Sequence, residues 1–97
     1  MVTRAKITGA LDEYLDINVI ADASLNGLQV EGNEEVSRVA LAVDAAQVTI
    51  AAAVDSGCQF LVVHHGLFWG QQVALTGIVG RRVRACFAAD LSVYAAH

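Results

Sequence analysis

The spacing of apolar and polar residues predicts an amphipathic helix at the start of the chain. Apolar residues recur every three or four positions, with acidic residues between them, which favours a helix from about Thr3 to Asp16. Thr3 stands where an N-cap is expected. The predicted inner face comprises Ile7, Ala10, Leu11, Tyr14 and Leu15. The less regular segment Ile17 to Ser24 is interpreted as a connection.

Two turn sequences follow and enclose a short extended segment. Asn26-Gly27 and Glu31-Gly32-Asn33 are typical of turns, and the three residues between them predict a short strand. Asn26 and Gln29 are candidates for lining a site. Turn formation for Asn26, and an outward strand position for Gln29, are the better interpretation from composition alone.

The middle of the chain predicts a right-handed βαβ unit. Val39 to Val43 and Gln59 to Val63 are continuous apolar runs, typical of parallel strands covered on both faces. A helix from about Ala45 to Ser56 connects them, and Gly57 is expected to follow its end. The two strands are therefore predicted to be neighbours with their carboxyl ends at one edge of a sheet.

Asp44 follows the first of these strands and has Gln47 three residues later. This spacing is typical of a helix N-cap with its capping-box partner, which is the preferred interpretation. Because Asp44 and His64 are predicted to lie at the same sheet edge, Asp44 has an alternative role. In that alternative, Asp44 binds a metal ion itself or accepts a hydrogen bond from a residue that does.

A third helix and a third strand complete the pattern. Thr76 is expected to cap the helix, whose predicted inner face comprises Val79, Val83, Cys86 and Phe87. Leu91 to Ala96 predicts a further strand that reaches His97. Together these elements predict an α/β fold, a layered and mostly parallel sheet with flanking helices that is part of a larger domain.

The third predicted helix contains three arginines, Arg81, Arg82 and Arg84. Surface arginines need no partner, so a solvated helix face is the preferred interpretation. The alternative is a contact with a phosphate or an acidic ligand.

Composition changes this picture mainly through its high apolar content. The 97 residues are 56% hydrophobic and 16% charged, with a mean hydropathy of +0.51. A small domain has much surface to cover, so the excess favours a large oligomer interface or a piece of a larger protein. The net charge of −4 argues against a general nucleic-acid binder.

The expected location is cytoplasmic. No apolar run is long enough to predict a membrane span, and Asp12, Glu13 and Asp16 exclude a signal-peptide core. Cys58 and Cys86 lack CxxC spacing and stand in apolar surroundings, which predicts buried free thiols.

The candidate chemistry lies where the apolar run Leu61 to Val63 ends in His64 and His65. Ligands of open α/β sheets bind at the carboxyl ends of the strands, and imidazole is a common metal ligand. Because side chains alternate along a strand, the pair is expected to serve two neighbouring ions, or one ion after a bend permitted by Gly66. Hydrogen-bonded histidines without a metal are the alternative.

Three sequence blocks, taken together, point to a known family. They are Asn26-Gly27-Leu28-Gln29-Val30-Glu31-Gly32, then Val63-His64-His65-Gly66-Leu67-Phe68-Trp69, and last Tyr94-Ala95-Ala96-His97. In this order and spacing they resemble the YbgI-like dinuclear-metal family, also known as GTP cyclohydrolase 1 type 2 or NGG-interacting-factor-like. The resemblance covers essentially the whole chain.

The resemblance implies a metal site that this chain supplies in part. It implies that His64 and His65 bind one ion each of a pair of divalent ions, Zn, Mn or Fe, and that His97 is a catalytic group that assists as a proton-transfer or ligand-orienting residue. It further implies that residues 1–97 are the amino-terminal part of a dinuclear-metal-binding domain, truncated after the third core strand, and that the intact protein is a homohexamer.

The implied function is a metal-dependent hydrolase in which activated water attacks a purine nucleotide such as GTP or a related small molecule. The 97 residues alone are expected to be inactive. The alternative is a metal-binding interaction or regulatory protein without turnover. Turnover of a nucleotide by metal-loaded, full-length protein separates the two.

Overall fold

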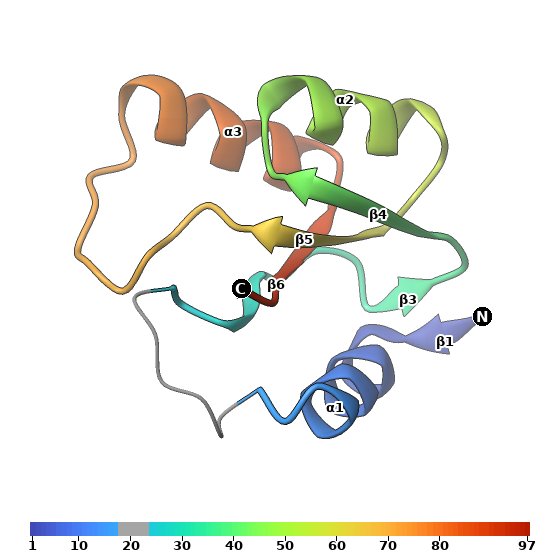
Figure 1. Cartoon of the computed structure of the whole chain (residues 1–97). Helices are drawn as coiled ribbons and strands as arrows, with labels where there is room; N and C mark the ends of the chain where they lie inside the picture. Colours follow the sequence, from blue (N-terminus) through green and yellow to red (C-terminus); the bar gives the residue numbers. More distant parts are fainter. Residues whose placement is uncertain (18–23) are drawn as a thin grey trace.

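A four-stranded sheet forms the centre of the protein in a computed structural model that describes residues 1–17 and 24–97 (Figure 1). Its strand order is β2-β6-β5-β4. β4, β5 and β6 are parallel, and β2 pairs antiparallel with β6. The predicted mostly parallel α/β fold is therefore confirmed. The strands are β2 (Gly27–Val30), β4 (Val39–Asp44), β5 (Phe60–His65) and β6 (Ser92–Ala95).

Two short strands, β1 (Val2–Thr3) and β3 (Glu35–Val36), form a separate antiparallel pair beside this sheet. Of the predicted connection Ile17 to Ser24, residues 18–23 lie outside the described part of the chain.

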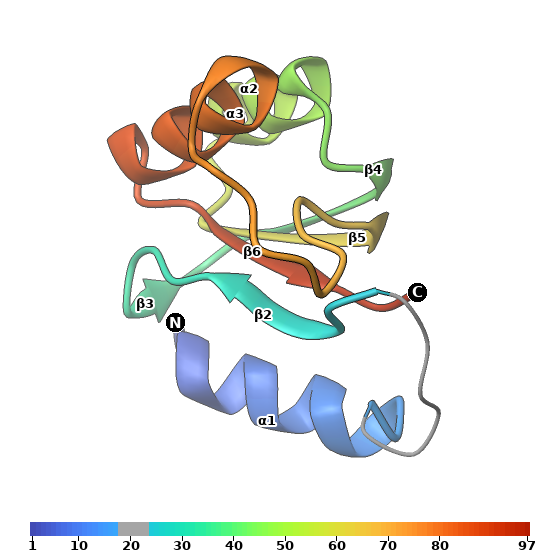
Figure 2. The same cartoon turned by 90° about the vertical axis from the view of Figure 1, so that its left-hand side faces the viewer.

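Helices lie on both faces of the sheet. α2 (Gln47–Asp55) and α3 (Gly77–Ala88) lie on one face, and α1 (Arg4–Tyr14) lies on the other (Figure 2). Side chains alternate along β5, so Leu61 and Val63 join the core beneath α2 and α3, whereas Phe60 packs with Tyr94 on the α1 side. In the same view the carboxyl ends of β4, β5 and β6 point to one edge of the sheet.

The face of β4 opposite α2 is uncovered, since Val39, Leu41 and Val43 are 43%, 79% and 62% exposed. The prediction that this strand is covered on both faces is therefore wrong.

α1 begins as predicted, because Thr3 is its N-cap and accepts a hydrogen bond from the Lys6 amide at 3.2 Å. Ile7 and Leu11 pack against the core on this face. The prediction that Tyr14 and Leu15 belong to the inner face is wrong, since they are 86% and 41% exposed. The helix ends at Tyr14, and its apolar contact with the core runs through Ile7 and Leu11, while Asp12 accepts a hydrogen bond from the buried Tyr94 hydroxyl at 2.7 Å.

The capping role predicted for Asp44 is wrong. α2 begins only at Gln47, and its N-cap is Ala46, which has no side-chain hydrogen bond to the helix. Asp44 is still the last residue of β4, and its carboxylate is hydrogen-bonded to His65 instead. Gly57 follows the helix as predicted, with a φ of +74° and its amide donating to the Val54 carbonyl.

α3 starts after Thr76, which occupies the N-cap position without a side-chain hydrogen bond. Val83 and Cys86 are buried as predicted, and Val79 packs against the core. The inner position predicted for Phe87 is wrong, since this side chain is 55% exposed. The stripe through Val79, Val83 and Cys86 already fills the contact with the core, and Phe87 lies beside it.

The two thiols are buried and free, as the sequence predicts. Burial raises the pKa of Cys86 to about 11, so this thiol stays neutral at physiological pH and is a poor nucleophile. Among the described residues, no helix has both the length and the apolar character required to cross a membrane.

Candidate metal centre

Three histidines meet at the carboxyl edge of the parallel strands. His64 and His65 end β5, and His97 follows the neighbouring strand β6. The ring centroids lie 4.4 Å apart for His64 and His65, 4.7 Å for His64 and His97, and 5.4 Å for His65 and His97. One potential ligand nitrogen from each ring lies within 4.8 Å of the other two. The parallel pairing therefore gathers all three into one cluster.

Two of the rings are oriented by hydrogen bonds at Nδ1. His65 Nδ1 lies 2.7 Å from Asp44 Oδ1, and His64 Nδ1 lies 3.1 Å from the Ala96 carbonyl oxygen. Both acceptors lack a proton to give, so in each pair the imidazole Nδ1–H donates. A neutral imidazole in this state keeps its lone pair on Nε2. Metal-bound histidines show the same arrangement, and the donor set therefore fits a divalent ion.

The two adjacent histidines turn toward different neighbouring strands. His65 is in register with Asp44 on β4, and His64 reaches the carbonyl of Ala96 just after β6. Alternation along β5 does not separate the rings, because both stand at the strand end and are only 4.4 Å apart. The pair can therefore act at one place, and metal binding by it stays a prediction.

His97 is held through its backbone amide, and its exposed ring contacts two other rings. Its amide donates to Asn26 Oδ1 at 2.9 Å, which ties the residue after β6 to the start of β2. Its ring stacks on His64 with an interplanar angle of 8°, and Trp69 packs edge-on against it at 5.1 Å between centroids. Asn26 is thus more than a turn residue, because it fixes a member of the cluster.

Gln29 organises the loop that follows the histidine pair. Its Oε1 accepts from the amides of Leu67 and Phe68 at 2.7 and 3.3 Å, and its Nε2 donates to the carbonyls of Phe68 and Leu25 at 3.0 and 2.6 Å. A Cβ atom at Gly66 would collide with this amide group. The outward position predicted for Gln29 is therefore wrong.

Replacing Gln29 by alanine is expected to lower the free energy of unfolding by about 2 kcal/mol, because the amides of Leu67 and Phe68 lose their acceptor. The matched control is Gln72→Ala, since Gln72 is exposed and makes no hydrogen bond within the described residues. Denaturant unfolding, followed by the fluorescence of Trp69, measures the free energy of unfolding of both variants. Equal stability of the two variants would contradict the role assigned to Gln29.

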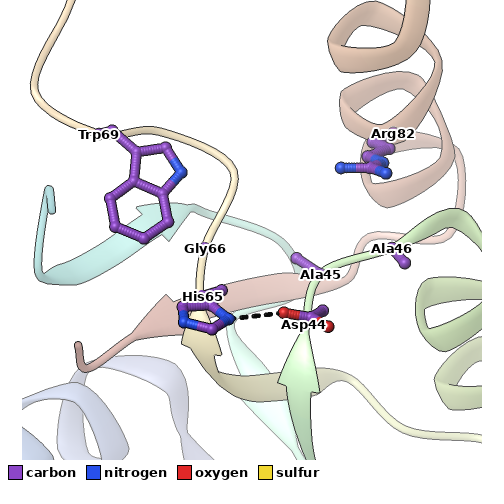
Figure 3. Close-up of a pocket in the computed structure, with 7 residues that line it drawn as sticks. All are labelled: Asp44, Ala45, Ala46, His65, Gly66, Trp69 and Arg82. Atoms are coloured by element: carbon purple, nitrogen blue, oxygen red, sulfur yellow. Dashed lines mark hydrogen bonds and ion pairs between the residues drawn. The ribbon is translucent and has the colours of Figure 1, made fainter.

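An open cavity of about 430 Å³ adjoins the cluster. Figure 3 shows Asp44 and His65 joined at its floor, Trp69 on the loop above His65, and Arg82 reaching in from α3. Arg81 and Arg84 are exposed, in agreement with a solvated helix face. The sequence interpretation thus holds for two of the three arginines and fails for Arg82, whose place depends on how α3 packs.

Comparisons with known proteins agree with the resemblance seen in the sequence. The model of the family Duf34/NIF3 (NGG1p interacting factor 3) matches residues 2–97. A "GTP cyclohydrolase 1 type 2 homolog" from Deinococcus radiodurans is 47% identical over 96 residues, which are 99% of this chain and 36% of the relative. A protein of the same name from Archaeoglobus fulgidus is 50% identical over 96% of this chain and 38% of its own length.

Solved structures share the fold. A crystal structure of a Thermus thermophilus protein has a TM-score of 0.94 and 42% identity, covering 99% of this chain and 40% of that one. The protein ybgI, described as of unknown function, has a TM-score of 0.93 and 33% identity over 99% of this chain and 39% of its own. This chain thus spans little more than a third of the length of the curated relatives above. It belongs to the Duf34/NIF3 family.

Proposed function

We propose that these residues form the amino-terminal part of a dinuclear metal-dependent hydrolase that acts on a purine nucleotide or a related small molecule, with GTP as the first substrate to test. The observation that carries the proposal is the cluster of His64, His65 and His97, each offering a nitrogen within 4.8 Å of the others. The names of the relatives, GTP cyclohydrolase 1 type 2 homologs, support the choice of substrate.

In this proposal His64 and His65 hold the two divalent ions, Zn, Mn or Fe, through Nε2. Bound ions of this kind polarise a substrate oxygen and lower the pKa of water toward neutrality. The protein's own contribution is orientation. The Asp44 carboxylate fixes the ring of His65, and the Ala96 carbonyl fixes the ring of His64, so neither ring has to reorganise when an ion binds.

His97 is proposed as the group that moves a proton between the substrate and water. Its ring lies against His64 and Trp69 and is exposed to solvent. An imidazole can accept a proton from water and return it as imidazolium to the substrate, which suits this task. Trp69 contacts the ring of His97 edge-on, and His97 stays exposed, so a substrate can reach it.

A chimera tests the proposal most directly. Residues 1–97 are continued into the remaining part of the Deinococcus radiodurans relative, and the metal-loaded protein is incubated with GTP while products are separated by chromatography. We expect GTP to be consumed by the chimera and not by the 97-residue chain alone. His97→Gln in the chimera is expected to retain metal and lower turnover about 100-fold or more, in the range typical for a lost general acid or base.

Nucleotide turnover by the metal-loaded chimera decides between a hydrolase and a metal-binding protein. A chimera that holds two ions per chain and turns over neither GTP nor another nucleotide would overturn the hydrolase proposal in favour of a metal-binding interaction protein. Tight binding of two ions and GTP turnover by the 97-residue chain alone would contradict the assignment of this chain as only part of the site.

A further inference from the structure

β4 is the edge strand of the sheet at the end away from β2, and in the described part of the chain no strand pairs with its outer side (Figure 2). The Arg38 carbonyl accepts from the Gln59 amide at 3.0 Å, so it points toward β5. Because backbone groups alternate along a strand, those of Ala40 and Ala42 face β5 as well. The residues that alternate with them direct their N–H and C=O groups outward. These residues are Val39, Leu41 and Val43.

This edge lacks the features that protect open strand edges in soluble proteins. Those features are charged side chains, proline, a bulge or a very short strand. β4 has six residues in constant register with β5 and is uncharged from Val39 to Val43. The opposite edge strand, β2, has only four residues, and its register shifts between Leu28 and Val30. The sheet is therefore protected at one edge and open to pairing at the other.

Apolar surface lies on both sides of the open edge. On the face opposite α2, Leu41 and Val43 are 79% and 62% exposed. On the other face, an open groove of about 210 Å³ lies between β4 and α2 and is lined mainly by small residues. They include Ala40, Ala42, Thr49, Ala52 and Ser56. A further strand along β4 covers the first surface and places its own side chains over the groove.

The two ends of β4 carry opposite charges. Arg38 precedes the strand and Asp44 ends it, and both are exposed. Arg38 donates to the Ser56 carbonyl at 2.7 Å, and among residues 1–17 and 24–97 it has no carboxylate partner. Asp44 uses Oδ1 to accept from His65 Nδ1. A second β4 in antiparallel orientation therefore brings each arginine opposite an aspartate.

We propose that β4 pairs antiparallel with β4 of a second copy of this chain, about a two-fold axis at Leu41. Leu41 then faces Leu41 of the partner subunit in a hydrogen-bonded pair, because its backbone groups point outward. In the same register Arg38 faces the partner's Asp44 in a non-hydrogen-bonded pair, the type in which side chains lie closer together. The direction of the backbone and the charges at the strand ends thus agree on one register.

This pairing brings a cation of one copy to the candidate metal centre of the other. The partner's Arg38 lies opposite Asp44, the carboxylate that orients His65 through Oδ1. Oδ2 is then the acceptor for the partner's guanidinium. The inference does not depend on the proposed function, because strand pairing requires neither metal nor substrate.

Sedimentation equilibrium of the metal-free 97-residue chain tests the dimer. Leu41→Lys removes an apolar contact and sets two like charges face to face at the axis, so we expect the dissociation constant to rise at least about 100-fold. Phe87→Lys is the matched control, since Phe87 is also exposed but lies on α3, and it is expected to leave dimerisation unchanged. A monomeric unchanged chain, or equal weakening in both variants, would overturn the inference.

Charge reversal tests the register. Arg38→Glu faces the partner's Asp44 with a like charge, and Asp44→Arg does the same to Arg38, so each is expected to weaken dimerisation about tenfold. The double variant Arg38→Glu/Asp44→Arg restores opposite charges and is expected to return to within about threefold of the unchanged chain. If the double variant were as weak as the single variants, the antiparallel register would be wrong.

Hydrogen exchange distinguishes strand pairing from other contacts. The protection of the Val39, Leu41 and Val43 amides is expected to rise with protein concentration, and that of Ala42, which faces β5, far less. A dimer without this rise would refute edge pairing. The same amides are followed in the chimera with the Deinococcus radiodurans relative, of which this chain covers 36%. Their protection in a monomeric chimera would overturn the inference, because another part of the longer chain would then cover the edge.

Discussion

Replacing His65 by alanine is expected to weaken Zn²⁺ binding by the 97-residue chain at least about 100-fold. Loss of a group that merely orients a ligand already weakens metal affinity roughly 10- to 100-fold, and loss of the ligand itself removes more. His64→Ala is expected to behave in the same way, since its ring lies 4.4 Å from that of His65. Competition with a chromophoric chelator measures the affinities.

The graded control is Asp44→Asn. An asparagine Oδ1 can still accept the Nδ1–H of His65 at 2.7 Å but without the charge, so a loss of about tenfold is expected. Arg84→Gln, on the exposed face of α3, serves as the neutral control. If His64→Ala and His65→Ala bound Zn²⁺ as tightly as the unchanged chain, the assignment of these residues as ligands would be wrong.

Gly32→Ala is expected to produce the largest loss of stability, about 3 kcal/mol or more. A Cβ atom at this position would collide with the backbone of Asp90 and Leu91, which cannot move aside as a flexible side chain does. The carbonyl of Gly32 accepts a hydrogen bond from Arg4, and its amide donates one to the Ser92 hydroxyl oxygen, so a shift would strain both. Denaturant unfolding measures the loss.

Gly9→Ala is the matched control, because a Cβ atom there meets nothing within 4 Å and the residue lies inside α1. Alanine is a better helix former than glycine, so this variant is expected to gain up to about 1 kcal/mol. Opposite signs for the two substitutions are therefore predicted. Similar effects at both positions would show that the stability of the protein does not depend on the close approach of Gly32 to the backbone of Asp90 and Leu91.

The sequence predicts the architecture well because the governing patterns are local. Continuous apolar runs identify β4 and β5, the intervening helical spacing identifies α2, and together they imply parallel pairing with both carboxyl ends at one edge. The same logic brings His64 and His65 to that edge. Errors occur where the local pattern fits two outcomes, as for the start of α2 near Asp44 and for the side of α3 on which Phe87 lies.

The contacts that shape the candidate site were decided only by the tertiary structure. The Asp44–His65 pair spans 21 positions, Gln29 reaches Phe68 across 39, and Asn26 holds His97 across 71. Such contacts depend on strand register and on the direction of each side chain. Local propensity and periodicity contain no information on strand register or on side-chain direction. A polar residue near a turn fits the same local pattern whether it faces water or another strand.

Arg82 shows this limit most plainly. The sequence places three arginines on one helix, and their composition favours a solvated face for all of them. Packing of α3 over the sheet turns Arg82 toward the cavity and leaves Arg81 and Arg84 in solvent. The sequence by itself thus determined the parallel sheet, the histidine pair at its edge and the family. The folded chain alone decided which polar groups surround that pair, since their directions are fixed by packing between elements distant in sequence.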